Sequence, residues 1–481
     1  MKKLLKSSVA FISLSAITFP ALALTPDEVL SFVKEDIQDA GFTLKDENIS
    51  RKNGSILIKD TIMNKDGFTL FIPSVILKPV GSSVDILFPG KINGRGNSGE
   101  SVVLDLSASK LRLNDSVLPS MLGNIFGNFE GDVSVKISNK ELEIPEYTDF
   151  FIKGINLSVS EGVSSGFGKA ELTTSDTFFA FSGNVDGEDL VIKAQYGPSV
   201  SVFGVSDVSL FSSDDPVKLI SNGVDLFLSS SQDFGKYTVL MNSSDQMVKT
   251  SWGITKTDIR LDRMGLSYNV EANSFIFDFN RLSNMPLDLS GTLGKLFINF
   301  KLPLFNQNKE ESVDLSFGLL NTSISSENYQ NIPLELKPFL DQEVNINASA
   351  TATVTMKEDF WPQSIDSMGN YKPYVNMIKD VTINKLSLQL GQSKLNATGV
   401  MNMNGESMFN IQPGKAKAFV KLTGIDNLFD ILVRSGITSS DETSMASIML
   451  RGVAKPGESS TLSYDIEMDG PGSIKINGNK F

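Results

Sequence analysis

The most regular pattern in this chain is an alternation of apolar and polar residues from Val344 to Lys357. Successive side chains of a β-strand point to opposite faces, so the alternation predicts one long strand with an apolar and a polar face. At ~3.3 Å per residue the strand would be about 45 Å long, well beyond the usual length of about 5–6 residues. Its apolar positions, which we expect to line a ligand groove, are Val344, Ile346, Ala348, Ala350, Ala352, Val354 and Met356.

The same period of two recurs along much of the chain. It is found at 133–137, 155–159, 313–319, 386–390, 462–468 and 474–476. Segments rich in Asn, Asp and Gly, such as 64–67 and 184–187, are typical of turns between strands. The pattern therefore predicts a mainly β protein, with long antiparallel strands in an elongated curved sheet or an open sandwich.

Helical signals are confined to the two ends of the chain. Thr25 and Pro26 are typical of a helix N-terminus, the apolar spacing that follows is helical, and Gly41 can end the helix. Near the C-terminus, Asp426 is predicted to cap a short helix that closes at Gly436. A second helix is expected over 440–450, with Met445, Ile448 and Met449 on one face.

The linker-like stretches 212–216 and 229–232 favour a division into two halves near residue 250. We expect a signal peptide at 1–23, an N-terminal β-rich half with a leading helix at 24–250, and a C-terminal β-rich half with two short helices at 251–481.

The first residues have the features of a secretory signal. Lys2, Lys3 and Lys6 precede an apolar stretch over 9–23, which ends in the small-x-small sequence Ala21-Leu22-Ala23. The stretch is shorter than the roughly 18–20 residues that span a bilayer. We therefore expect cleavage after Ala23, export to the periplasm and no transmembrane segment in the mature chain.

Composition narrows the chemistry further. The 481 residues include no cysteine and no histidine, so disulfides, thiolate catalysis and imidazole bases or ligands are excluded. Without the signal, 40 basic residues face 56 acidic ones, a formal charge of −16 that disfavours nucleic acid as a partner. The acidic clusters at 186–189 and 214–215 lack the ligand spacing of an EF-hand, so we expect solvated turns, no metal and no cofactor.

Three short motifs match catalytic or nucleotide-binding spacings, and each lacks its necessary context. The G-x-G-x-x-G at 94–99 is followed by a strand pattern instead of a helix, which predicts a hairpin loop. The G-x-S-x-G at 162–166 has no histidine to act as base. Ser107 and Lys110 would meet only on a helix, whereas their surroundings read as strand. We therefore expect no enzyme.

The chain is rich in phenylalanine and poor in tryptophan, with 32 Phe against 2 Trp. This balance favours dry packing surfaces over sugar-binding ones. The phenylalanines predicted to be core are Phe178, Phe179, Phe181, Phe297, Phe300 and Phe317. The aromatic–proline segment with Trp361, Tyr371 and Tyr374 is interpreted as a packed crossover.

A series of short blocks resembles an exported alphaproteobacterial family of domains of unknown function, number twenty-one twenty-five. The blocks are A-L-T-P-D-E-V at 23–29, D-V-T-I-N-K-L at 380–386, A-T-G at 397–399, K-L-T-G at 421–424, N-L-F-D at 427–430, G-V-A-K-P-G-E at 452–458 and G-S-I-K-I-N-G at 472–478. The resemblance covers about half of the chain and implies an exported, β-rich protein with no known reaction. Residues 383–403 also resemble the strand pairs of AsmA-like envelope proteins, which implies lipid handling by analogy.

Two hypotheses for function stay open at this point. In the first, a phospholipid or another apolar ligand binds in a β-sheet groove lined by the apolar positions of 344–356, in the service of envelope maintenance. In the second, the same residues form a closed sandwich core, and the protein is a non-enzymatic structural or protein-interaction component of the envelope.

Overall fold

The computed structural model describes residues 24–39, 48–65, 67–97, 99–114, 126–139, 146–161, 168–185, 188–206, 220, 223–241, 246–280, 289–305, 309–326, 332–340, 342–356, 375–404, 412–456, 461–470 and 473–480. The predicted signal peptide at 1–23, the G-x-S-x-G segment, the acidic pair at 214–215 and the aromatic–proline segment around Trp361 lie outside these residues.

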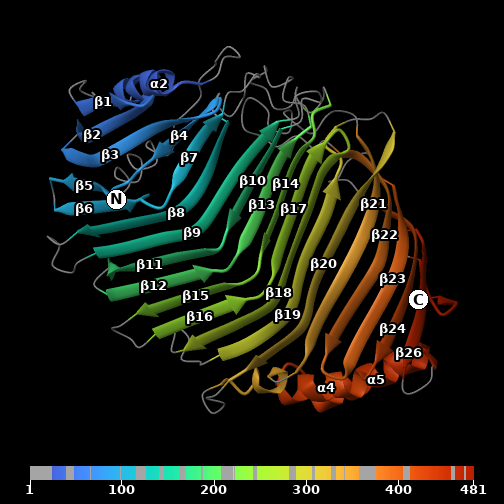
Figure 1. Ribbon diagram of the computed structural model, residues 1–481. Helices are drawn as coiled ribbons and strands as arrows, with labels where there is room; N and C mark the ends of the chain where they lie inside the picture. Colours follow the sequence, from blue (N-terminus) through green and yellow to red (C-terminus); the bar gives the residue numbers. More distant parts are fainter. Residues whose placement is uncertain are drawn as a thin grey trace. The chain divides into compact units, whose positions relative to one another are not determined.

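The protein is mainly β, with 72% of the described residues in strand, as the period-two pattern predicted. The strands pair antiparallel, and the helices are few. Contacts divide the chain into two compact units, Met1–Ser243 and Ser244–Phe481. Figure 1 shows both units and the labels used below. No helix among the described residues is long and apolar enough to cross a membrane.

The first unit begins with a helix and continues almost entirely in strands. Its elements are α2 (Pro26–Asp39), β1 (Ile49–Lys52), β2 (Ser55–Lys65), β3 (Phe68–Val80), β4 (Ser83–Leu87), β5 (Ile92–Gly96), β6 (Glu100–Asp105), β7 (Lys110–Asn114), β8 (Phe126–Asn139), β9 (Glu146–Glu161), β10 (Gly168–Thr174), β11 (Asp176–Val185), β12 (Glu188–Tyr196), β13 (Ser199–Val205), β14 (Leu226–Gln232) and β15 (Gly235–Met241).

Long strands in this unit each pair with two shorter strands placed end to end. The first part of β3 pairs with β5 and its last part with β4, while β8 pairs in the same way with β6 and β7. Gly131 marks the break within β8, where a β-carbon would lie 2.4 Å from the Cα of Ser109. Only glycine fits this position, because its φ of +141° and the close backbone leave no room for a side chain.

The core of the first unit lies where α2 packs against β2 and β3. Val29 and Leu30 of the helix are buried together with strand residues such as Leu77 and Val84. The predicted start of this helix is confirmed: the Glu28 backbone N–H donates to the Thr25 hydroxyl, and the Thr25 N–H donates to the Glu28 carboxylate at 2.8 Å.

The second unit consists of strands followed by two helices and a short final hairpin. Its elements are β16 (Gln246–Trp252), β17 (Thr255–Asp262), β18 (Gly265–Asn280), β19 (Leu289–Leu302), β20 (Glu310–Ser325), the 3-10 helix η4 (Lys337–Phe339), β21 (Val344–Met356), β22 (Val375–Leu390), β23 (Ser393–Asn404), β24 (Gln412–Thr423), α4 (Ile425–Arg434), α5 (Ser440–Val453), β25 (Lys455–Pro456), β26 (Leu462–Asp469), β27 (Ile474–Ile476) and β28 (Asn479–Lys480).

From β17 to β24 each strand of the second unit pairs with the next one along the chain, and β26 extends the sheet beyond β24. The long strand predicted from Val344 is confirmed as β21, which lies between β20 and β22. The other period-two segments also lie in strands. In Figure 1, α4 and α5 lie at one end of the strands β22 to β26.

An irregular line crosses the middle of three neighbouring strands. Ser274 of β18 and Asn321 of β20 have φ values of +55° and +53°, which are uncommon outside glycine. Between them, a β-carbon on Gly294 of β19 would lie 2.9 Å from the Asn321 β-carbon. The Asn321 backbone N–H donates to the side-chain oxygen of Asn345 in β21, so the line is held by a specific polar contact.

The helix predicted from Asp426 exists as α4, but its predicted cap is wrong. The N-cap is Gly424 in the left-handed conformation, with φ of +67°. A β-carbon there would lie 2.5 Å from the Gln392 backbone oxygen, so the tight passage from β24 into the helix requires glycine. Asp426 lies in the first turn and pairs with Arg451 of α5 at 2.7 Å.

The second helix, α5, begins with a capping box. The Ser439 hydroxyl accepts from the Glu442 N–H, and the Glu442 carboxylate accepts from the Ser439 N–H at 2.8 Å. Together with the hydroxyls of Thr438 and Ser439, this backbone contact lowers the pKa of Glu442. The ionised form of Glu442 therefore stabilises the first turn of α5.

We expect the start of α5 to loosen in acid. Because the folded pKa of Glu442 is depressed, its contribution is complete above the ordinary glutamate pKa of about 4.3 and is lost as pH falls through the folded value. Amide-exchange protection factors at Glu442 and Thr443, measured between pH 6 and 3, should fall over that window. The Glu442→Gln variant should show no such step, and an identical step in this variant would refute the assignment.

The phenylalanines predicted as core are not buried. All six lie half-exposed on strands, because each stands on a sheet face among side chains of neighbouring strands. Phe300 of β19, for example, stacks on Tyr268 of β18 with ring centroids 5.0 Å apart. These aromatics therefore supply apolar sheet surface, and the prediction that they are core residues is wrong.

Candidate functional site

The candidate site is the apolar face of the second unit, built around β21. Ala348 lies opposite Phe317 of β20 and Leu386 of β22, so their side chains share one face of the sheet. Ala350 likewise lies opposite Leu315 of β20 and Ile383 of β22. Followed pair by pair, one row of this apolar face runs through Tyr268, Phe300, Leu315, Ala350, Ile383, Gly399, Ala418, Ile466 and Ile476.

Side-chain size varies systematically across the apolar face. Ala348, Ala350 and Ala352 form a low strip along β21. Taller side chains of β20 and β22 stand directly beside this strip. The flanking residues are Val313, Leu315, Phe317, Val381, Ile383 and Leu386. A strip of methyl groups between two taller rows offers lateral contacts to a narrow apolar chain.

The apolar face is only partly shielded from solvent. Leu315 is 53% exposed, Ile383 41% and Leu388 39%, whereas a residue in a closed core is almost completely buried. Of the seven predicted groove residues, five are half-exposed and two, Val354 at 2% and Met356 at 5%, are buried. The part of β21 that a ligand can reach therefore runs from Val344 to Ala352.

The opposite face of the same strands is polar. The Thr351 hydroxyl donates to Asp314 of β20 at 2.9 Å and accepts from the Asn384 amide of β22 at 2.9 Å. Asn384 is the extra residue of a bulge in β22, where Ser349 and Ala350 of β21 pair with Lys385 and Ile383. The sheet thus separates an apolar face from a hydrogen-bonded one.

A shallow hollow of about 570 Å³ crosses β22, β23, β24 and β26. Side chains of the polar face that line it are Thr382, Asn384, Thr398, Val400, Lys417, Phe419, Asp465 and Glu467. The row between them, Ile383, Gly399, Ala418 and Ile466, directs its side chains to the apolar face. The backbone of that row therefore forms the floor of the hollow.

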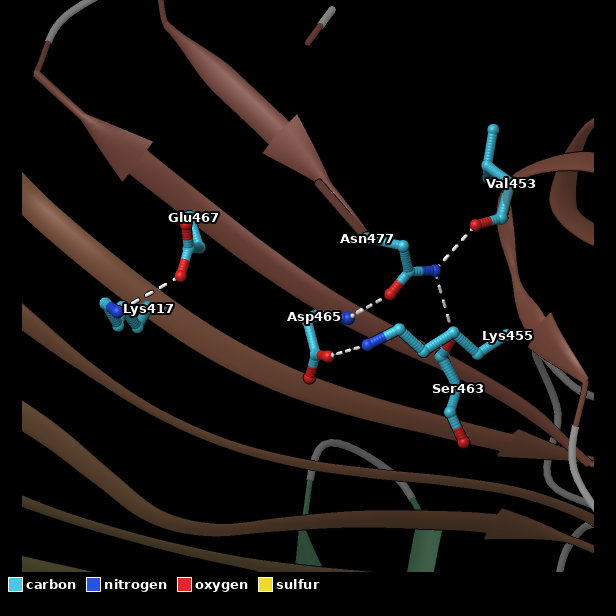
Figure 2. A network of polar contacts seen from close by, with 7 residues as sticks. All are labelled: Lys417, Val453, Lys455, Ser463, Asp465, Glu467 and Asn477. Carbon is cyan, nitrogen blue, oxygen red and sulfur yellow. Dashed lines mark hydrogen bonds and ion pairs between the residues drawn. The ribbon is translucent and has the colours of Figure 1, made fainter. Parts of the chain in front are cut away.

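Three lining residues of the hollow, Lys417, Asp465 and Glu467, belong to the network of polar contacts that Figure 2 shows. Lys417 pairs with Glu467 at 3.0 Å, and Lys455 pairs with Asp465. Asn477 accepts from the Asp465 N–H at 2.8 Å and donates to the backbone oxygen of Val453 at 2.6 Å. This asparagine, which has φ of +50°, ties the final hairpin to β26 and to the end of α5.

Sequence reasoning did not find the hollow, because its lining residues come from four different strands, whose lateral order and register the alternating pattern does not encode. One local signal was present. In the alternating segment 415–421, Phe419 occupies the phase otherwise held by Lys415, Lys417 and Lys421. An aromatic residue in the solvent phase of an amphipathic strand is the feature that could have indicated this site.

In two of the short motifs, the G-x-G-x-x-G at 94–99 and the pair Ser107 and Lys110, the described residues lie in strands and turns and not on helices. Residues 94–96 lie at the end of β5, which pairs antiparallel with β6, as the predicted hairpin requires. Ser107 lies in a turn and donates to Asp105 at 2.6 Å, while Lys110 pairs with Glu130 at 2.9 Å. Within the described part of the chain, no group of three or more acidic side chains is arranged to hold a metal ion.

No family model, curated protein or solved structure matches this chain. The resemblances to the exported alphaproteobacterial family and to AsmA-like proteins therefore stay predictions. Function has to be argued from the two faces of the sheet.

Proposed function

We propose that this protein is exported to the periplasm and binds the acyl chain of a lipid on the apolar face of its second unit. The observation that carries the proposal is the half-exposed strip of alanines on β21 between the taller side chains of β20 and β22. Exposed apolar surface of this kind is typical of an interaction site. A role in envelope maintenance follows from the proposed location and ligand.

Simple energetics support an acyl chain as the occupant. Each methylene group moved from water into an apolar environment contributes about 0.8 kcal/mol. The low strip is one strand wide, so a single extended chain could contact Ala348 and Ala350 from above and Leu315 and Ile383 from the sides. Because the apolar face of the strip carries no charged side chain from Val344 to Ala352, such a chain would meet no unpaired charge.

Lipid extraction and native mass spectrometry of the protein, purified after export and without detergent, test this proposal. We expect a phospholipid or another acyl species to co-purify in stoichiometric amount. A mass that is free of ligand and stays so after incubation with phospholipid vesicles would refute it.

A second function, docking of another envelope protein, is supported by a different feature. On α5, Met445, Ile448 and Met449 are 66%, 72% and 67% exposed. Their spacing places them on one side of the helix, while Leu450 and Val453 pack against the core of β26. The helix thus presents apolar side chains both inward and outward.

Charging the outer side of α5 should separate the two functions. We expect Ile448→Glu to leave the thermal unfolding midpoint nearly unchanged, because the side chain is 72% exposed. The bound lipid should also be unchanged, since the low strip lies on β21 whereas α5 packs against β26. If this variant loses the lipid while its unfolding is unaltered, α5 belongs to the lipid-binding site and the proposed placement is wrong.

A further inference from the structure

The hollow on the polar face combines an exposed aromatic ring with polar side chains. Phe419 is 46% exposed and Val400, on the neighbouring strand, is 43% exposed. Phe419 lies opposite Thr398 on one side and Asp465 on the other, so the ring stands between two polar residues. Phe419 therefore presents an apolar ring at the surface of the hollow.

Charges around the hollow are balanced. Glu467 is paired with Lys417, and Asp465 with Lys455, so each carboxylate has its own ammonium partner. An anion would compete with the two carboxylates for the lysine ammonium groups, and a cation would compete with the two lysines for the carboxylates. The local electrostatics therefore favour a neutral polar ligand over a charged one.

Hydrogen-bonding capacity is left over within the hollow. Each ion pair uses one carboxylate oxygen, Oε1 of Glu467 and Oδ2 of Asp465, and leaves the second oxygen of each as an acceptor. The hydroxyl groups of Thr382 and Thr398 add groups that can both donate and accept. Acceptors and hydroxyls thus surround an apolar ring in an open hollow of about 570 Å³.

We propose that this hollow binds a neutral saccharide, with the apolar face of a pyranose ring stacked on Phe419. A pyranose carries C–H groups on one face and hydroxyls around its rim, which complements the aromatic ring and its polar surroundings. The site is independent of the proposed lipid site, because the two use opposite faces of the sheet.

The test is saturation-transfer NMR on the full exported chain with maltotriose, cellotriose and triacetylchitotriose as separate probes. We expect at least one to bind saturably, with a dissociation constant near or below about 1 mM. Phe419→Ala should weaken that binding about tenfold or more, and Phe419→Trp should preserve it. Phe203→Ala is the matched control, since Phe203 is an exposed phenylalanine (37%) on β13 of the first unit, and it should bind like wild type.

Two results would overturn the inference. One is the absence of binding for all three saccharides up to about 10 mM. The other is equal binding by wild type and Phe419→Ala with circular dichroism spectra that coincide, which would place the saccharide elsewhere. Ala350→Trp should bind the saccharide normally, so a failed lipid experiment leaves this test intact.

Discussion

Replacing Leu462 with alanine is expected to lower the free energy of unfolding of the second unit by about 2–5 kcal/mol, whereas the same replacement at Leu315 should cost less than about 1 kcal/mol. Leu462 is 6% exposed and packs with Ile425 and Tyr464. Leu315 is 53% exposed on the apolar face. The two variants delete the same atoms from the same unit, so their difference reports how far each site is covered.

Denaturant unfolding of the lipid-free protein measures both values, with hydrogen exchange used to assign the transition to the second unit. If Leu315→Ala destabilises as much as Leu462→Ala, the apolar face is covered in solution and forms the closed core of the alternative hypothesis. The proposed lipid site would then have no accessible surface.

Replacing Ala350 with tryptophan is expected to remove co-purifying lipid almost completely, with at least a tenfold loss relative to wild type. Ala350 lies at the centre of the low strip, between Leu315 and Ile383. A side chain that fills the strip takes the volume of the acyl chain. Because the face is half-exposed, the larger side chain can be accommodated without overpacking a core.

Ser349→Trp is the matched control, since Ser349 precedes Ala350 on β21 and its side chain points to the opposite face. It adds the same ring to the same strand and should retain the lipid at wild-type amount. Equal retention by both variants would place the lipid away from β21. Equal loss would indicate general damage to the sheet, and the proposal would lose its support from this experiment.

The strands of this fold could be predicted from sequence because their signal is local. In 344–356 every second residue is apolar, and that period alone distinguishes a strand with two unlike faces from a helix. What covers the apolar face could not be predicted, since the pattern is the same for a closed sandwich and an open sheet. The burial of Val354 and Met356, and the exposure of Leu315, depend on tertiary surroundings that alternation does not encode.

The wrong cap of α4 has a comparable cause. Asp426 is a good N-cap residue by type, but the chain leaves β24 so close to Gln392 that only Gly424 fits at the turn. The irregular line through Ser274 and Asn321 was missed because serine does not indicate a positive φ, and Asn321, although asparagine adopts it more readily than most residues, lies within a strand pattern. Both features arise from contacts between segments that are distant in the sequence.

Photo-crosslinking with a phospholipid that carries a diazirine in its acyl chain tests the central claim most directly. After illumination and proteolysis, mass spectrometry should find adducts on residues of the apolar face, with Leu315, Ala350 and Ile383 foremost. Their neighbours on the polar face, Ser349 and Thr382, should stay unlabelled. Adducts confined to the polar face or to α5, or no adducts at all, would contradict the assignment of the apolar face as a lipid-binding surface.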